Sequence, residues 1–176
     1  RAELRDYSVA SLFPDYISGS KNHDEWEAIG VWAWGSSRIV DYLEREGRID
    51  MSKIAIMGHS RQGKAALWSG AQDSRFKVVI SNDSGCGGAA LSKRVYGENI
   101  ARITTVLSHW FCPAFSQYAG NEENLPFDQH EMLALIAPRH LYVASAEGDL
   151  WADPKGEYLS AYYTNKVYEL YKMKGL

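Results

Sequence analysis

One serine stands in a pattern that could support nucleophilic chemistry. Ser60 follows the apolar run 54–57 and precedes a helix-like run, 64–72, with Gly58 and Gly63 on either side of it. A strand, a sharp turn with a serine at its apex and a helix together present a hydroxyl above the edge of a sheet. The usual spacing is G-x-S-x-G, and here the second glycine comes one residue later. We expect a strained backbone at Ser60, with the two glycines letting strand and helix pass closely. The alternative is a strand that ends in an ordinary Gly/Ser turn.

Two aspartates could complete the chemistry of Ser60. A serine nucleophile needs a base that takes its proton and a carboxylate that orients this base. Asp149 comes just after a strand-like run that follows the serine, where an acid is expected, and Asp83 comes at the end of the strand-like run next after the serine. For either residue the alternative is a helix or turn cap, and we interpret Asp153 as such a cap.

The base is harder to place. In folds with this kind of serine turn the chain order is serine, acid, histidine. None of the five histidines follows Asp149; they are His23, His59, His109, His130 and His140. His109 is the least easily explained by a structural role, yet it precedes Asp149. We therefore expect that the chain is cut short and that the base lies beyond Leu176.

The elements that position these residues alternate between strand and helix. The apolar runs 53–58, 76–81 and 141–146 predict strands, and the strand–helix–strand order around Ser60 predicts parallel pairing. This pattern indicates an α/β-hydrolase fold, three-layered αβα with a mostly parallel sheet that is incomplete in this chain. We expect residues 1–176 to be part of a single domain of this fold, truncated at both ends.

Capping residues predict where the helices begin and end. Residues 1–21 read as a loop-rich N-terminal segment, and residues near 98–107 as short helical stretches. The proposed boundaries are Asn22 (with Glu25 as capping-box partner) to Gly47, 62 to 72, Asp128 (with Glu131) to Pro138, and Asp153 with Pro154 at the start of a last helix. The apolar positions of the last helix are Leu159, Tyr163, Val167 and Leu170.

Composition narrows the classes of function. The chain has 176 residues, which is enough for one domain with a hydrophobic core. Its net charge is −3, and it has no basic cluster of the kind that binds nucleic acid. No apolar run reaches the roughly 20 residues of a membrane span. Cys86 and Cys112 make neither a disulfide framework nor a metal-site spacing. We expect no metal, no cofactor and no membrane or nucleic-acid partner.

Several segments, taken together, resemble the glucuronoyl esterases of carbohydrate esterase family 15, of the bacterial type. Residues 58–64 resemble the signature G-C-S-R-x-G-K, with His59 in place of the cysteine. Residues 83–89 resemble the family segment E-S-G-x-G-G-A. Further matching segments are 125–130, 135–139 and 149–154.

The resemblance implies an α/β-hydrolase with a serine–histidine–acid triad and no metal. It implies cleavage of the ester between 4-O-methyl-glucuronate on xylan and lignin alcohols through an acyl-enzyme. Ser60 is then the nucleophile, and Arg61 resembles an arginine that helps stabilise the oxyanion. Lys64, Glu98 and Trp151 match positions that bind the sugar; the alternatives are a solvated helix charge for Lys64 and core packing for Trp151.

The resemblance also indicates which aspartate is the acid of the triad. Asp149 matches an acid position of bacterial members, and Asp83 replaces the usual glutamate with a side chain one methylene shorter. We expect Asp149 to be the main acid, with Asp83 assisting, and the chain alone to be inactive. A secreted or periplasmic location is implied by the resemblance only. Alternative functions are another carbohydrate esterase, such as an acetyl xylan esterase, and an inactive hydrolase domain that binds glycan.

Overall fold

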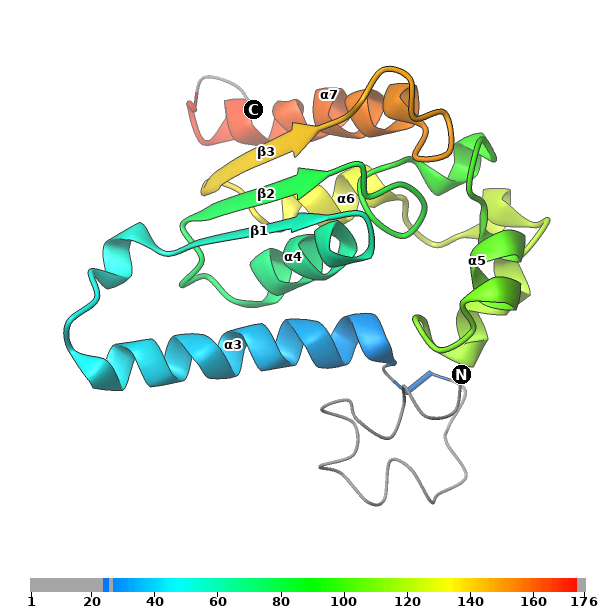
Figure 1. The fold of residues 1–176 in the computed structure, drawn as a ribbon. Coiled ribbons are helices and arrows are strands. Elements are labelled where there is room, and N and C mark those ends of the chain that lie inside the picture. The colour runs from blue at the N-terminus through cyan, green and yellow to red at the C-terminus, as the bar shows by residue number, and fades with distance from the viewer. Residues whose placement is uncertain (1–23, 26, 174–176) are drawn as a thin grey trace, which may run out of the picture.

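A computed structural model describes residues 24, 25 and 27–173. The predicted N-terminal loop 1–21, the proposed cap Asn22 and His23 lie outside these residues. Figure 1 shows a small sheet with helices packed along it, and a connecting region around α5 at one end. No helix among the described residues is long and apolar enough to cross a membrane.

Three parallel strands form the sheet, in the order β1-β2-β3. They are β1 (Ala55–His59), β2 (Val78–Asn82) and β3 (His140–Ala144). Ala55 pairs with Val78, and Val78 pairs with His140, so the strands are in step along their whole length. All three strands were expected from their apolar runs, with boundaries that differ by one or two residues.

Among the described residues, five α-helices connect and flank the strands, and Figure 1 shows how they lie around the sheet. They are α3 (Ala28–Glu46), α4 (Arg61–Gln72), α5 (Ile100–Val106), α6 (Gln129–Ala134) and α7 (Pro154–Leu170). Short 3-10 turns are Met51–Lys53, Ser92–Arg94, Pro113–Tyr118 and Glu122–Asn124.

Helix boundaries follow the predicted caps in part. Helix α3 ends as expected, because Gly47 takes up a left-handed conformation with φ 67°. Its first residue is Ala28, so the proposed capping box of Asn22 and Glu25 does not set its start, and Glu27 precedes it without a side-chain cap. Asp153 caps α7 through Gly156 N, as predicted.

Asp128 begins α6, but not through a capping box. Its carboxylate accepts hydrogen bonds from Gln129 N and, across the chain, from Ser92 N (2.7 Å) and Lys93 N (3.1 Å). The predicted partner Glu131 contributes only its backbone N–H, which donates to Asp128 O. Asp128 therefore joins the 3-10 turn at Ser92 to the start of α6.

The main core lies on one face of the sheet. It combines side chains from α3, α4, α6 and α7, from the inward positions of β2 and β3, and from the connecting segments between these elements. Its members are Val40, Leu67, Phe76, Val79, Ala89, Met132, Leu133, Ile136, Leu141 and Tyr168. On the opposite face Met57 is 73% exposed and Tyr142 is 60% exposed. The described residues thus supply the sheet and the helical layer on one side of it.

Helix α7 buries a different face from the one its apolar residues predict. Leu170 is 82% exposed and Tyr163 is 42% exposed, whereas the fully buried positions are Glu157, Ser160, Thr164 and Tyr168. Thr164 Oγ1 donates to His130 O on α6, and Tyr168 OH donates to Arg139 O. Thr164 and Tyr168 can face inward because their hydroxyls donate to backbone carbonyls of α6 and of the loop after it, and a hydrophobic pattern does not reveal such bonds.

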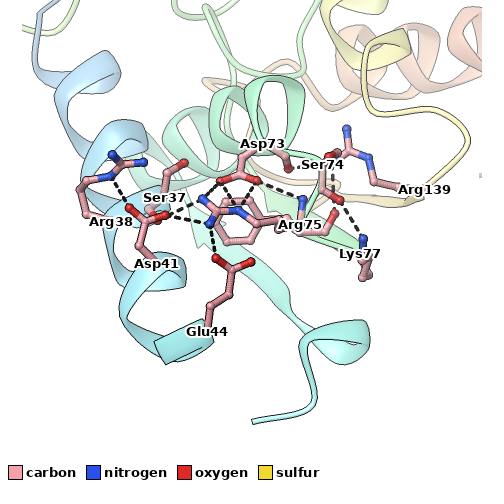
Figure 2. A network of polar contacts seen from close by, with 10 residues as sticks. Ser37, Arg38, Asp41, Glu44, Asp73, Ser74, Arg75, Lys77 and Arg139 are labelled. Atoms are coloured by element: carbon pink, nitrogen blue, oxygen red, sulfur yellow. Dashed lines mark hydrogen bonds and ion pairs between the residues drawn. The ribbon is translucent and has the colours of Figure 1, made fainter. Parts of the chain in front are cut away.

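A second set of polar contacts holds α3 against the turn between α4 and β2. Figure 2 shows Arg75 at the centre of this network. Its guanidinium contacts Asp73 (2.6 Å), Asp41 (2.7 Å) and Glu44 (2.9 Å), and Arg139 donates to Asp73 O. The guanidinium lowers the pKa of Asp73 from 3.8 to about 2. This cluster fixes the long helix at the sheet end opposite the serine turn.

Candidate active site

Ser60 occupies the strained turn that its sequence context predicts. It lies between β1 and α4 with φ 55° and ψ −125°, a conformation that non-glycine residues rarely adopt. Its backbone N donates to Asn82 O at the end of β2 (2.9 Å). A Cβ on Gly58 would lie 2.0 Å from Gln62 O, and one on Gly63 would lie 2.9 Å from Ser84 Cβ. Both glycines are thus required for close passage of strand and helix.

A cleft of about 260 Å³ opens beside this turn. It lies at the carboxyl edge of the sheet, because its residues end or follow the three parallel strands or belong to α5 and the segments on either side of it. Its lining residues are His59, Ser60, Lys64, Asp83, Ser84, Gly85, Glu98, Arg102, Val106, Leu107, Trp110, Asp149, Trp151 and Ala152. Of the seven residues predicted from the sequence, six share this cleft and Arg61 does not line it.

Lys64 is the most enclosed charge in the cleft. Its side chain is 3% exposed, and its ammonium donates to Ser84 O (2.6 Å), Cys86 O (2.6 Å) and Glu98 Oε2 (3.0 Å). These three acceptors use all the donors of an ammonium group. The interpretation of Lys64 as a solvated helix charge is therefore wrong: the residue holds the loop after β2 and orients Glu98.

The two candidate acids differ in how firmly they are bound. Asp83, with φ 45°, accepts a hydrogen bond at Oδ1 from Ala146 N (2.6 Å), and its Oδ2 lies 3.9 Å from His59 Nδ1. Among the described residues, the side chain of Asp149 accepts only a long hydrogen bond, from Ala152 N (3.4 Å). One carboxylate oxygen of Asp83 thus links the loops after β2 and β3. The carboxylate of Asp149 is held less firmly and can accept further hydrogen bonds.

Among the described histidines only His59 lines the cleft. Its side chain is 67% exposed, and its Nδ1 lies 2.8 Å from Asn82 Nδ2. His109 lies edge-on to Trp110, His130 packs against Tyr163, and His140 is the first residue of β3. No described histidine therefore joins Ser60 and Asp149 in the arrangement of a triad.

Cationic side chains lie against two aromatic rings that line the cleft. The guanidinium of Arg61 lies 6.0 Å from the ring centroid of Trp110, and the ammonium of Lys64 lies 5.8 Å from it. Trp151 is 51% exposed, with the Arg102 guanidinium 6.0 Å from its ring centroid. Such exposure rules out core packing for Trp151 and leaves its ring available to a ligand.

A buried cysteine, Cys86, lies beside the cleft, where its backbone carbonyl accepts a hydrogen bond from Lys64. Cys86 and Cys112 are free, and burial raises the pKa of the Cys86 thiol to about 12, so it is not a thiolate at neutral pH. In the part of the chain that the structure describes, no three His, Cys, Asp or Glu side chains are grouped to hold a metal ion.

A comparison with protein families now decides the affiliation. Residues 20–172 match the family model described as glucuronyl esterase, fungi. The chain belongs to the glucuronoyl esterase family. Its fold is accordingly that of an α/β-hydrolase, as its solved relatives also show.

Individual relatives give the same affiliation. A carbohydrate esterase, MZ0003, from an unknown prokaryotic organism is 51% identical over 86% of this chain and 35% of its own length. A 4-O-methyl-glucuronoyl methylesterase of Podospora anserina is 40% identical over 66% of this chain and 26% of its own length. The solved glucuronoyl esterase from Solibacter usitatus is 48% identical with a TM-score of 0.89, over 97% of this chain and 43% of that one. The chain thus spans between a quarter and somewhat under half of these relatives.

Four residues in or beside this cleft were not predicted from the sequence. Trp110 and Arg102 line the cleft, but nothing in their local sequence separates them from core or surface residues. Glu157 is 0% exposed and accepts hydrogen bonds from the loops after β2 and β3. Ser84 links Glu157 to Lys64 through its backbone. Glutamate in a first helical turn is common, so only its burial marks Glu157.

Proposed function

We propose that this glucuronoyl esterase chain is part of a serine carboxylic ester hydrolase. The proposed substrates are esters of 4-O-methyl-glucuronate on glucuronoxylan with lignin alcohols. The single observation that carries the proposal is Ser60 in a strained turn, facing the same cleft as Lys64, Glu98 and Trp151. An activated hydroxyl beside a set of polar and aromatic sugar contacts fits an ester whose acyl group is itself a sugar acid. Because this substrate is a cell-wall polymer, we also propose that the enzyme is exported.

Ser60 would act as the nucleophile in two steps. Its Oγ bonds to the ester carbonyl carbon while a base takes its proton, and the resulting tetrahedral intermediate expels the alcohol together with that proton. Water then hydrolyses the acyl-enzyme to give free glucuronate and Ser60. We place the base outside the described residues, since no described histidine has the required position, and we propose Asp149 as its main orienting acid with Asp83 assisting.

Arg61 would stabilise the oxyanion from the mouth of the cleft. It follows Ser60 directly, and its guanidinium lies over Trp110, a lining residue. A fixed positive charge near the carbonyl oxygen lowers the energy of the tetrahedral intermediate more than that of the neutral ester. The stacking on Trp110 limits the freedom of the long Arg61 side chain.

The sugar contacts divide into direct and supporting ones. Lys64 spends its three donors on protein acceptors, so we propose that it acts chiefly by presenting Glu98. Oε2 of Glu98 is bonded to Lys64, and Oε1 is left to accept from a uronate hydroxyl. The exposed ring of Trp151 would stack on the sugar face.

The test is substrate discrimination by the full-length enzyme. We expect it to hydrolyse a benzyl ester of glucuronate and to leave acetylated xylan unchanged. Ser60→Ala should abolish hydrolysis, and Trp151→Ala should raise KM for the glucuronate ester. A preference for acetylated xylan would identify another carbohydrate esterase. Glycan binding without Ser60-dependent hydrolysis of either substrate would identify an inactive, glycan-binding domain.

A further inference from the structure

Glu157 is a buried carboxylate that the proposed chemistry does not use. It lies in the first turn of α7, is 0% exposed, and takes part in no salt bridge among the described residues. Burying an ionisable group without a cation is costly unless hydrogen bonds compensate. Burial accordingly raises the pKa of Glu157. A buried carboxylate with this desolvation cost points to a role that an apolar side chain would not perform.

The hydrogen bonds of Glu157 reach two separate loops. Oε1 accepts from Ser84 N (2.7 Å), Gly85 N (2.9 Å) and Ser84 Oγ (3.0 Å), all in the loop after β2. Oε2 accepts from Ser145 Oγ, in the loop after β3. One carboxylate thus joins the two loops from beneath the cleft.

Each of these loops carries one of the candidate acids. Asp83 immediately precedes Ser84, and its Oδ1 accepts from Ala146 N, the residue after Ser145. Asp149 N in turn donates to Ala146 O (3.0 Å). A shift of either loop therefore moves Asp83 and Asp149 relative to each other and to Ser60.

The same loop carries the acceptors of Lys64. The ammonium donates to Ser84 O and Cys86 O from the cleft side, while Glu157 accepts from Ser84 N on the other side. Ser84 Oγ also accepts from Ser81 Oγ and Ala89 N, so its hydroxyl has no freedom left to rotate. Residues 83–86 are fixed between a buried cation and a buried carboxylate.

We propose that Glu157 is a positioning residue, which sets the spacing of the two acid-bearing loops and thereby the orientation of the triad. This inference rests on the proposed serine esterase function. Glu157 does not touch the substrate in this assignment; it acts through the backbone of Ser84 and Gly85 and through the hydroxyl of Ser145.

Three variants of the full-length enzyme separate positioning from simple stability. Glu157→Ala removes the joint between the loops. Glu157→Gln keeps an amide oxygen for Ser84 and Gly85 and an amide N–H for Ser145, without charge. Thr164→Val is the matched control, because Thr164 lies on the same helix, is 1% exposed and bonds to His130 O instead of to the loops.

We expect Glu157→Ala to lower kcat for the benzyl glucuronate ester on the order of 10²-fold, the effect of misplacing catalytic groups by about 1 Å. KM should change less than about threefold. Because loss of folded enzyme alone also lowers the apparent kcat without changing KM, all variants are measured well below their Tm, where each is folded. Glu157→Gln should keep kcat within about threefold of wild type. Thr164→Val should lower Tm without changing kcat. A kcat for Glu157→Ala no lower than that of Thr164→Val, or a Glu157→Gln as impaired as Glu157→Ala, would overturn the proposal.

Hydrogen–deuterium exchange tests the joint independently of the substrate. In Glu157→Ala, amides of residues 83–89 and of 145–149 should both lose protection, whereas in Thr164→Val neither segment should. Increased exchange in only one of the two segments contradicts the bridging role. A fluorophosphonate probe measures the reactivity of Ser60 without a glucuronate ester. Labelling that is slowed in Glu157→Ala but not in the other two variants would support the positioning role. If the wild-type enzyme were labelled but inactive on glucuronate esters, only the substrate assignment would fail.

Discussion

Replacing Lys64 by methionine should destabilise the protein far more than the loss of a surface lysine. Methionine is close to lysine in volume but supplies no donor. The change leaves Ser84 O and Cys86 O without the ammonium and leaves the Glu98 carboxylate, whose side chain is 9% exposed, without its cation. Breaking a buried ion pair by removing one partner costs about 3–5 kcal/mol. Whole domains are stable by only about 5–15 kcal/mol, so this change should be large in any unfolding experiment.

A double-mutant cycle identifies the source of this cost. Much of it comes from the isolated Glu98 charge, so Lys64→Met combined with Glu98→Gln should recover about 1–3 kcal/mol relative to Lys64→Met alone. Lys155→Met is the matched control, since Lys155 is exposed on α7 and should change stability by no more than about 0.5 kcal/mol.

Urea unfolding of the full-length protein, followed by tryptophan fluorescence, measures the free energy of unfolding of wild type, Lys64→Met, Glu98→Gln, the double variant and the Lys155→Met control. Trp110 beside Lys64 makes fluorescence sensitive to this region. Loss of less than about 1 kcal/mol in Lys64→Met would refute the argument, since the ammonium would then not be holding the loop. Destabilisation without coupling to Glu98 would place the cost in the two carbonyls instead of the ion pair.

Three further predictions concern the triad and the acid limit of stability. Asp149→Asn should lower kcat/KM on a benzyl glucuronate ester more than Asp83→Asn, by up to about 10⁴-fold, and the reverse order would assign the main acid to the loop after β2. A purified chain of residues 1–176 should hydrolyse this ester on the order of 10⁴-fold more slowly than the full-length enzyme; strong Ser60-dependent turnover would mean that one of its own histidines is the base. Arg75 lowers the pKa of Asp73 from 3.8 to about 2, so the ionised carboxylate contributes about 2 kcal/mol above pH ~4 that is lost as pH falls toward 2. The difference in unfolding free energy between wild type and Asp73→Asn should therefore shrink over that range, and a pH-independent difference would contradict this.

Local sequence predicted the elements that depend on local physics. Three short apolar runs became three parallel strands, and Gly47, Asp153 and Pro154 end or begin helices where their backbone preferences require. The strained conformation of Ser60 was also readable, because only small neighbours permit it. The roles proposed for the site residues stay predictions, although six of the seven share one cleft.

Sequence-based interpretation failed where the environment of a residue is formed by segments that are distant in the sequence. Lys64 was open to interpretation as a surface charge, yet its acceptors lie 20 to 34 residues away. The buried face of α7 is largely polar: Thr164 and Tyr168 donate to backbone carbonyls of α6 and of the loop after it, and Glu157 accepts from the loops after β2 and β3. Hydrophobic periodicity detects apolar burial only, so it does not reveal this face.

The sequence by itself determined the order of strand and helix, the serine turn and the family resemblance, because each depends on residues close together in the chain. Only the tertiary structure decided which charges are enclosed and what they hold. Glu157 shows the difference: its donors, Ser84 and Ser145, lie 73 and 12 residues away. The energy of a buried charge depends on the donors that folding gathers around it, and no local pattern specifies that set.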